Sequence, residues 1–174
     1  QALLAHDLEE EYEMATNRGE FLVNKRLDWS LRGDEYILHA RPKFLKNPTT
    51  GRPLEYDRYD PKAEFATEHN GIQHYRESDM YSEEQVRQQK AHDLMKESLS
   101  MRNGVTLLTF TWRDLRPGVL EARLREAVPH LTRGYIDMAG AYAKTLNRIC
   151  DAYASKAERA EKEAAARERA QSAG

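Results

Sequence analysis

The apolar residues of the N-terminal part recur with the period of an α-helix. Between Glu20 and Leu31 they follow the three-to-four-residue spacing of a helix that buries one face. Asn17 precedes this segment as a candidate N-cap, and Glu20 stands three residues later in the capping-box position. A shorter acidic helix is expected over 5–14. The chain therefore begins with two predicted helices, and Gly33 ends the second.

From Tyr36 onward, apolar and polar residues alternate, which predicts β-strands that bury one face. Segments rich in proline, glycine and aspartate separate the alternating runs and are typical of turns. Strands joined by short turns pair as an antiparallel meander. The predicted strands cover residues 36–40, 54–58 and 63–68.

The second half of the chain adds a helix, a buried strand and a further helix. The continuous apolar run Val105 to Phe110 is typical of a buried strand. The helix expected before it, closed by Asn103 and Gly104, favours parallel pairing with a neighbour. Another helix is predicted from Val119 to Leu131. Together these patterns predict an α/β fold in which a small mixed sheet, a meander plus one parallel strand, is flanked by helices.

Large side chains after Arg133 form a stripe with heptad-like spacing on a predicted long helix. The stripe can pack on the chain's own domain, or on a partner such as a second copy of this chain or another part of a larger protein. The pattern leaves both open. From Ser155 onward alanine is the only apolar residue, which predicts a solvated helix that frays into disorder. The stripe consists of Tyr135, Ala139, Tyr142, Leu146, Ile149 and Tyr153.

Length and composition suit one folded domain with an appendage. The 174 residues divide into an N-terminal helical segment (1–17), a core domain (18–132) and a C-terminal helix with a polar tail (133–174). No apolar run approaches the roughly 20 residues of a membrane span, and no segment resembles a signal peptide. Cys150 is the only cysteine, which excludes a disulfide or a thiolate zinc cluster within one chain. We expect an intracellular protein, cytoplasmic or nucleoid-associated, without a membrane partner.

The net charge of −2 argues against nucleic-acid binding by bulk electrostatics, because phosphate neutralisation drives non-specific binding. Basic residues nevertheless gather ahead of the third predicted strand. They can form a phosphate-binding surface or an ordinary solvated loop face. These residues are Arg41, Lys43, Lys46, Arg52 and Arg58.

Two acidic residues on neighbouring predicted strands carry the most specific chemical signal. Asp57 lies in one strand, and Glu68 ends the next and leads into His69, Asn70 and Gly71. Carboxylates that converge from adjacent strands suit a hard divalent cation, because Mg²⁺ prefers oxygen ligands. A metal held there can activate water and polarise a phosphodiester. Either acid alone would be interpreted as a solvated surface residue, whereas the pair favours a site.

The sequence LEYDRYDPKAEFATEHNGIQHY, which begins at Leu54, resembles the core of the PD-(D/E)XK nuclease superfamily. Its nearest likeness is to the branch of very-short-patch-repair-like endonucleases. Weaker matches extend the resemblance over about 18–131. The matching residues are Tyr56, Asp57, Arg58, Tyr59, Pro61, the run from Glu68 to Tyr75, Gln89, His92, Asp93, Lys96 and the strand from Gly104 to Leu108.

The resemblance implies a restriction-endonuclease-like fold and a metal-dependent endonuclease that hydrolyses phosphodiester bonds, with DNA favoured. Asp57 and Glu68 would hold Mg²⁺ or Mn²⁺. Glu20 would reach in from the first core helix as a ligand or to position water, although it can equally be a capping-box acid. The superfamily usually has a lysine two residues after the second acid, where this chain has Asn70.

Three residues are candidate substitutes for that lysine. His74 can carry a proton near neutral pH, whereas Gln73 can only ligate metal or orient water. Lys96 can supply a positive charge from the following helix. Together with Arg52 and Arg58, it is also a candidate contact to nucleic acid.

Two other functions remain open. The absence of a lysine at Asn70 favours a catalytically inactive nuclease fold that binds nucleic acid or acts as a scaffold through its C-terminal helix. Alternatively, the stripe from Tyr135 to Tyr153 is the working part of an interaction protein.

Overall fold

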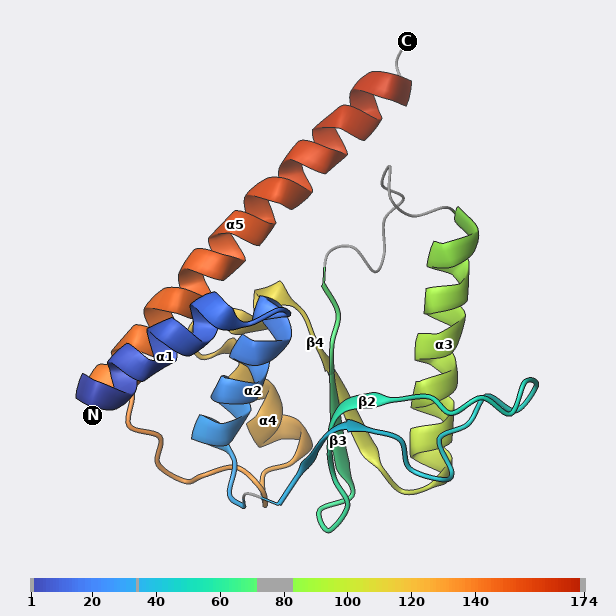
Figure 1. Cartoon of the computed structure of the whole chain (residues 1–174), viewed down its shortest axis with the longest axis horizontal. Coiled ribbons are helices and arrows are strands. Elements are labelled where there is room, and N and C mark those ends of the chain that lie inside the picture. Colours follow the sequence, from blue (N-terminus) through green and yellow to red (C-terminus); the bar gives the residue numbers. More distant parts are fainter. Residues whose placement is uncertain (1, 34, 72–82, 173–174) are drawn as a thin grey trace.

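The computed structural model describes residues 2–33, 35–71 and 83–172. Its centre is a four-stranded sheet in the order β1-β2-β3-β4 (Figure 1). The first three strands pair antiparallel, and the fourth pairs parallel with the third. The predicted α/β fold with a meander plus one parallel strand is confirmed. The strands are β1 (Ile37–Ala40), β2 (Tyr56–Asp60), β3 (Phe65–His69) and β4 (Thr106–Phe110).

Helices cover both faces of the sheet (Figure 1). On one side α3 packs on β4, and on the other α2 packs on β3. The long α5 lies along α1 and then extends beyond the rest of the molecule. The helices are α1 (Ala2–Met14), α2 (Arg18–Ser30), α3 (Glu83–Arg102), the short 3₁₀ helix η2 (Trp112–Leu115), α4 (Val119–Ala127) and α5 (Ala141–Ser172).

Helix α4 is shorter than the sequence predicts. It was expected to reach Leu131 but ends at Ala127, and Val128 leaves the helical region with φ −136° and ψ 58°. Pro129 follows, and the ring of a proline disfavours helical dihedrals at the residue before it.

Helix α5 begins later than the heptad-like spacing predicts. It starts at Ala141, so Tyr135 lies outside the helix and is 81% exposed. The reason is a turn at Asp137, whose Oδ1 accepts hydrogen bonds from the backbone N–H groups two and three residues on. The helix then continues to Ser172, through the segment that was expected to fray.

The stripe on α5 packs on the chain's own domain. Leu146 is 1% exposed and Ile149 is 5% exposed, within a core that also receives Leu8 of α1 and Leu124 of α4. Of the two alternatives for this stripe, the structure shows the intramolecular one. The terminal helices therefore share one core with residues 18–132.

Among the described residues, no helix is both long and apolar enough to cross a membrane.

A buried ionic link fixes α2 against α4 and α5. Arg26 is 1% exposed, and its Nη1 lies 3.1 Å from Glu121 Oε1 and 2.6 Å from Asn147 Oδ1. A buried guanidinium needs such partners, because removing one leaves an uncompensated charge in the core. The link holds α2, the helix that carries Glu20, in a fixed position against the core.

Candidate functional site

Asp57 and Glu68 face each other where the pairing of β2 with β3 ends. The last pair of that ladder is Arg58 with Thr67, so Asp57 and Glu68 are the next opposed positions. Opposed residues of an antiparallel pair point to the same face of the sheet. Asp57 Oδ2 accepts a hydrogen bond of 2.7 Å from the backbone N–H of His69. Both predicted carboxylates therefore belong to one site.

A lysine from α3 joins this pair. Lys96 Nζ lies 2.6 Å from Glu68 Oε2 and 3.1 Å from the carbonyl oxygen of Glu55. Asn70, two positions after Glu68, is buried, and its backbone N–H donates a hydrogen bond of 2.8 Å to Phe110 O at the end of β4. The positive charge beside Glu68 thus comes from helix α3 and not from the strand that carries the acid.

Burial controls the protonation of both acids. It raises the pKa of Glu68 to about 7, while the Lys96 ammonium opposes the rise and the Asp57 charge adds to it. Burial also raises the pKa of Asp57, against the lowering effects of the hydrogen bond from His69 and of the Lys96 charge. Near neutral pH a proton therefore competes with a metal cation for the Glu68 carboxylate.

Glu20, in the first turn of α2, is not among the residues that line the cavity with Asp57 and Glu68, but it contacts Asn17, which is one of them. Its pKa is raised by burial and, to a smaller extent, by the negative charge of Asp57. Asn17 is the N-cap as predicted: its Oδ1 accepts from the Glu20 N–H at 3.3 Å. Its Nδ2 donates to Glu20 Oε2 at 2.9 Å, so the Glu20 side chain meets the cap's amide rather than its backbone.

Sequence reasoning missed a histidine at the rim of the site. His39 Nδ1 lies 3.2 Å from Glu55 Oε1, and its Nε2 lies 3.6 Å from Glu20 Oε1. Its φ of 51° is unusual for a residue other than glycine and turns the backbone out of regular strand geometry. Alternation of apolar and polar residues around His39 gave no signal of this distortion.

Asp57 and Glu68 line an open cavity of about 370 Å³. His69 also lines it and was not a predicted site residue, although it directly follows Glu68 in the sequence. Gln89 and His92 line it from α3. The full lining is Asn17, Pro53, Leu54, Glu55, Asp57, Glu68, His69, Gln89, His92 and Lys96.

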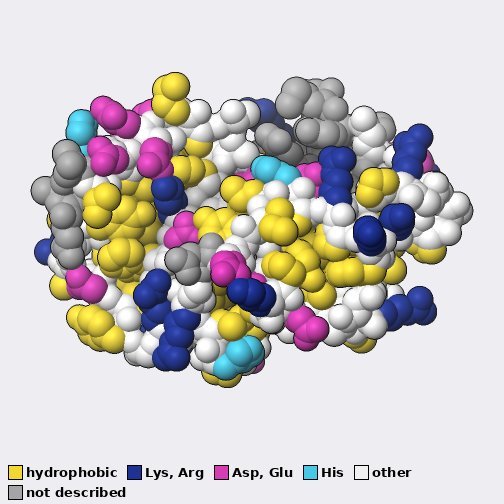
Figure 2. All heavy atoms as spheres, turned by 60° about the horizontal axis from the view of Figure 1, so that its bottom comes forward, with side chains coloured by type: hydrophobic (Ala, Val, Ile, Leu, Met, Phe, Trp, Pro, Cys, Tyr) yellow, Lys and Arg dark blue, Asp and Glu magenta, His cyan; other side chains and the backbone are white. Residues whose placement is uncertain are grey.

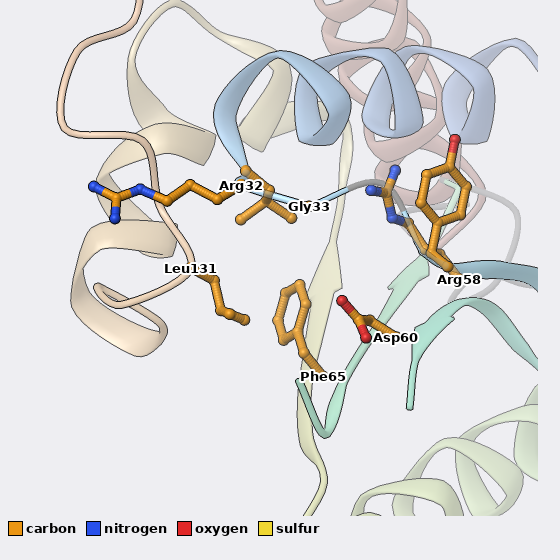
Figure 3. A pocket seen from close by; sticks show the side chains of 8 residues that line it. Arg32, Gly33, Arg58, Asp60, Phe65 and Leu131 are labelled. Carbon is orange, nitrogen blue, oxygen red and sulfur yellow. The ribbon is translucent and has the colours of Figure 1, made fainter. Parts of the chain in front are cut away.

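The structure separates Arg58 from this cavity, which corrects its expected role as a contact to nucleic acid. Arg58 is 4% exposed, its Nη1 pairs with Asp28 Oδ1 at 2.6 Å, and its guanidinium stacks on the Tyr36 ring at 3.5 Å. Figure 3 shows it beside Asp60 and Phe65 at a second hollow, of only about 10 Å³. A space of that size holds a single water at most.

The remaining predicted residues fall elsewhere. Arg52 is exposed in the connection between β1 and β2 and does not line the cavity. Gln73 and His74, the candidate metal ligand and proton carrier, lie outside the described residues.

The donor set at the site fits a divalent cation that takes oxygen ligands. Within the described ranges, no three His, Cys, Asp or Glu side chains form a cluster that could hold a metal. Glu68 Oε1 is buried, and no described residue hydrogen-bonds to it. Mg²⁺ needs few protein ligands, because substrate phosphate and water complete its shell. Asp57 and Glu68 are the residues that would hold it.

The fold and this cleft define an α/β protein with a carboxylate–lysine cluster where two antiparallel strands part.

No family model and no solved structure matches the chain. The chain is 38% identical over 115 residues to uncharacterized protein 033L of Invertebrate iridescent virus 3, covering 63% of this chain and 58% of that protein. It is 38% identical over 85 residues to uncharacterized protein 307L of Invertebrate iridescent virus 6, covering 44% and 43%. The chain thus spans about half the length of these curated relatives.

Proposed function

We propose that this chain is a metal-dependent endonuclease with a restriction-endonuclease-like, PD-(D/E)XK fold, which hydrolyses phosphodiester bonds with DNA as the favoured substrate. One observation supports this most strongly: Asp57, Glu68 and Lys96 meet in one cleft. The two acids come from adjacent strands and the lysine from a helix across the cleft. This is the donor set for a cation plus a positive charge for a phosphate.

Each residue has a role in this proposal that follows from its chemistry. Asp57 and Glu68 would hold Mg²⁺ or Mn²⁺, which lowers the pKa of a bound water and offsets charge on the scissile phosphate. Lys96 would donate hydrogen bonds to a phosphate oxygen beside Glu68. Glu20, from α2, would accept a hydrogen bond from the attacking water and orient it.

A cleavage assay tests the proposal. Wild type would be incubated with Mg²⁺, Mn²⁺ or EDTA on single- and double-stranded DNA and RNA. We expect metal-dependent cleavage of DNA, and at least a roughly 100-fold loss in Asp57→Asn and Glu68→Gln, because even outer-shell substitutions cost 10–100-fold. Glu64→Gln is the matched control, since Glu64 is exposed and directly precedes β3, away from Glu68. Cleavage that survives in Asp57→Asn would overturn the proposal.

An inactive nuclease fold that binds nucleic acid, or a scaffold acting through its C-terminal helix, is the second candidate. It is favoured by Asn70, which stands where the superfamily usually has a lysine. Binding of DNA without cleavage in Mg²⁺ or Mn²⁺ would support this second candidate.

A further inference from the structure

Residues 41–54, between β1 and β2, form a projection that we call the β1–β2 arm. It extends past α3 at one end of the molecule (Figure 1). Its sequence, RPKFLKNPTTGRPL, contains four basic residues and no acidic one, in a chain whose net charge is −2. Figure 2 shows Lys and Arg side chains at this end of the face and also over its other half. The arm is a local positive patch that the overall charge conceals.

The arm is braced rather than loose. Backbone bonds cross it from Leu54 N to Leu45 O and from Asn47 N to Arg52 O, both at 2.8 Å. At the tip, Asn47 Oδ1 accepts from the N–H groups of the second and third residues beyond it, and Gly51 takes the positive φ of 69° that closes the turn.

Leu45 anchors the base of the arm. It is fully buried in the core cluster that it shares with Tyr56, Ala66 and Val105. Charges held on such a braced element lose little conformational entropy when a ligand binds.

Three of the arm's four cations are available to a ligand. Arg41 is engaged, with Nε 2.7 Å from Glu55 Oε2. Lys43, Lys46 and Arg52 are exposed, and no acidic side chain of the described ranges pairs with them.

The arm also forms a wall of the acidic cavity. Pro53 and Leu54 line it together with Asp57 and Glu68. A polyanion bound along Lys43, Lys46 and Arg52 would therefore pass next to the carboxylates. The acids themselves repel phosphate, so neighbouring cations are needed to hold it there.

We propose that the β1–β2 arm binds the phosphodiester backbone of a nucleic acid through Lys43, Lys46 and Arg52 and holds it beside the cleft. The inference rests on the proposed function in naming nucleic acid as the polyanion. It goes beyond that function by assigning binding to residues outside the cavity. Contacts of this kind fix position without reading sequence, so the arm would act on many sequences alike.

Fluorescence anisotropy in EDTA measures binding without cleavage. The probes are labelled duplex DNA, single-stranded DNA and single-stranded RNA. Replacing Lys43, Lys46 and Arg52 together by Gln should weaken binding of the preferred probe at least about tenfold. The slope of log K against log salt should fall by roughly 2 to 3 on duplex DNA, because each lost phosphate contact removes about 0.9.

The matched control replaces Arg125, Arg133 and Lys144 by Gln, which removes the same charge from exposed positions near α4 and α5. If the control variant and the arm variant bind the probe equally weakly, binding depends on the overall charge of the protein and not on the arm, and the proposal is overturned. Wild type without salt-dependent binding to any probe would overturn it as well.

The two proposals fail in different assays. Binding that depends on the arm, without cleavage in Mg²⁺ or Mn²⁺, would support the arm and refute the nuclease. Cleavage that depends on Asp57 while the arm variant keeps wild-type KM and salt slope would refute the arm alone.

Discussion

Replacing Glu68 by Gln should change how the stability of the protein depends on pH. Burial raises the pKa of Glu68 from 4.5 to about 7 in the folded state. Below pH 4.5 the carboxyl is protonated in both states and does not oppose folding. As pH rises from 4.5 through about 7, the unfolded state releases this proton, whereas the folded state must either keep it or bury a charge. The free energy of unfolding therefore falls over this range. The amide of the glutamine variant has no proton to lose in this range, so the variant lacks this dependence.

The size of the effect follows from the two pKa values. Their difference corresponds to roughly 3 kcal/mol in the free energy of unfolding, at about 1.4 kcal/mol per pH unit. Between pH 5 and pH 8, about 2 kcal/mol of this is lost in wild type. The variant also leaves Lys96 without its carboxylate partner, and that cost is present at both pH values. The change with pH therefore isolates the contribution of Glu68.

Urea unfolding in EDTA at pH 5 and pH 8 gives the comparison. Wild type should lose about 2 kcal/mol more than Glu68→Gln over this range. Glu64→Gln, at an exposed position, should follow wild type. Mn²⁺ at about 100 times its Kd should then restore roughly 2.7 kcal/mol to wild type at pH 8 and little to Glu68→Gln. Equal pH dependence in wild type and Glu68→Gln would refute the reasoning.

Three further substitutions test other parts of the structure. Lys96→Met removes the charge that lowers the pKa of Glu68, so the Glu68 carboxyl signal in NMR should titrate at higher pH than in wild type; an unchanged titration would contradict the contact. Leu146→Asp places a charge in the core, so the free energy of unfolding of the monomer, measured by thermal unfolding, should fall by several kcal/mol. A variant as stable as wild type would show that Leu146 is not buried. Gly19→Ala brings a methyl group into the ring of His69, which should cost about 1–3 kcal/mol in urea unfolding; full stability would show that the two can separate.

The strands could be predicted because their order follows local pattern. Alternation and turns gave the meander, and the apolar run from Val105 gave the parallel strand. The missed ends of α4 and α5 depend on single residues, Pro129 and Asp137, whose effect is stronger than the apolar spacing around them. A hydrophobic period shows which face is buried but locates helix ends poorly.

The site was predictable only as far as it lies on adjacent strands. Asp57 and Glu68 meet because strand pairing brings them together, and strand pairing can be inferred from sequence. Lys96 meets Glu68 only through the packing of α3, so the sequence left it as one candidate among three. Arg58 is buried and pairs with Asp28, 30 residues away, whereas its place in a basic segment predicted an exposed contact to nucleic acid.

The proposed function requires that Asp57 and Glu68 form one divalent-cation site. Calorimetric titration of Mn²⁺ into wild type, Asp57→Asn, Glu68→Gln and the control Glu64→Gln at pH 8 tests it directly. We expect one Mn²⁺ site in wild type and in the control, and loss of that site in each of the two cleft variants. Binding that is unchanged in Asp57→Asn and Glu68→Gln would contradict it.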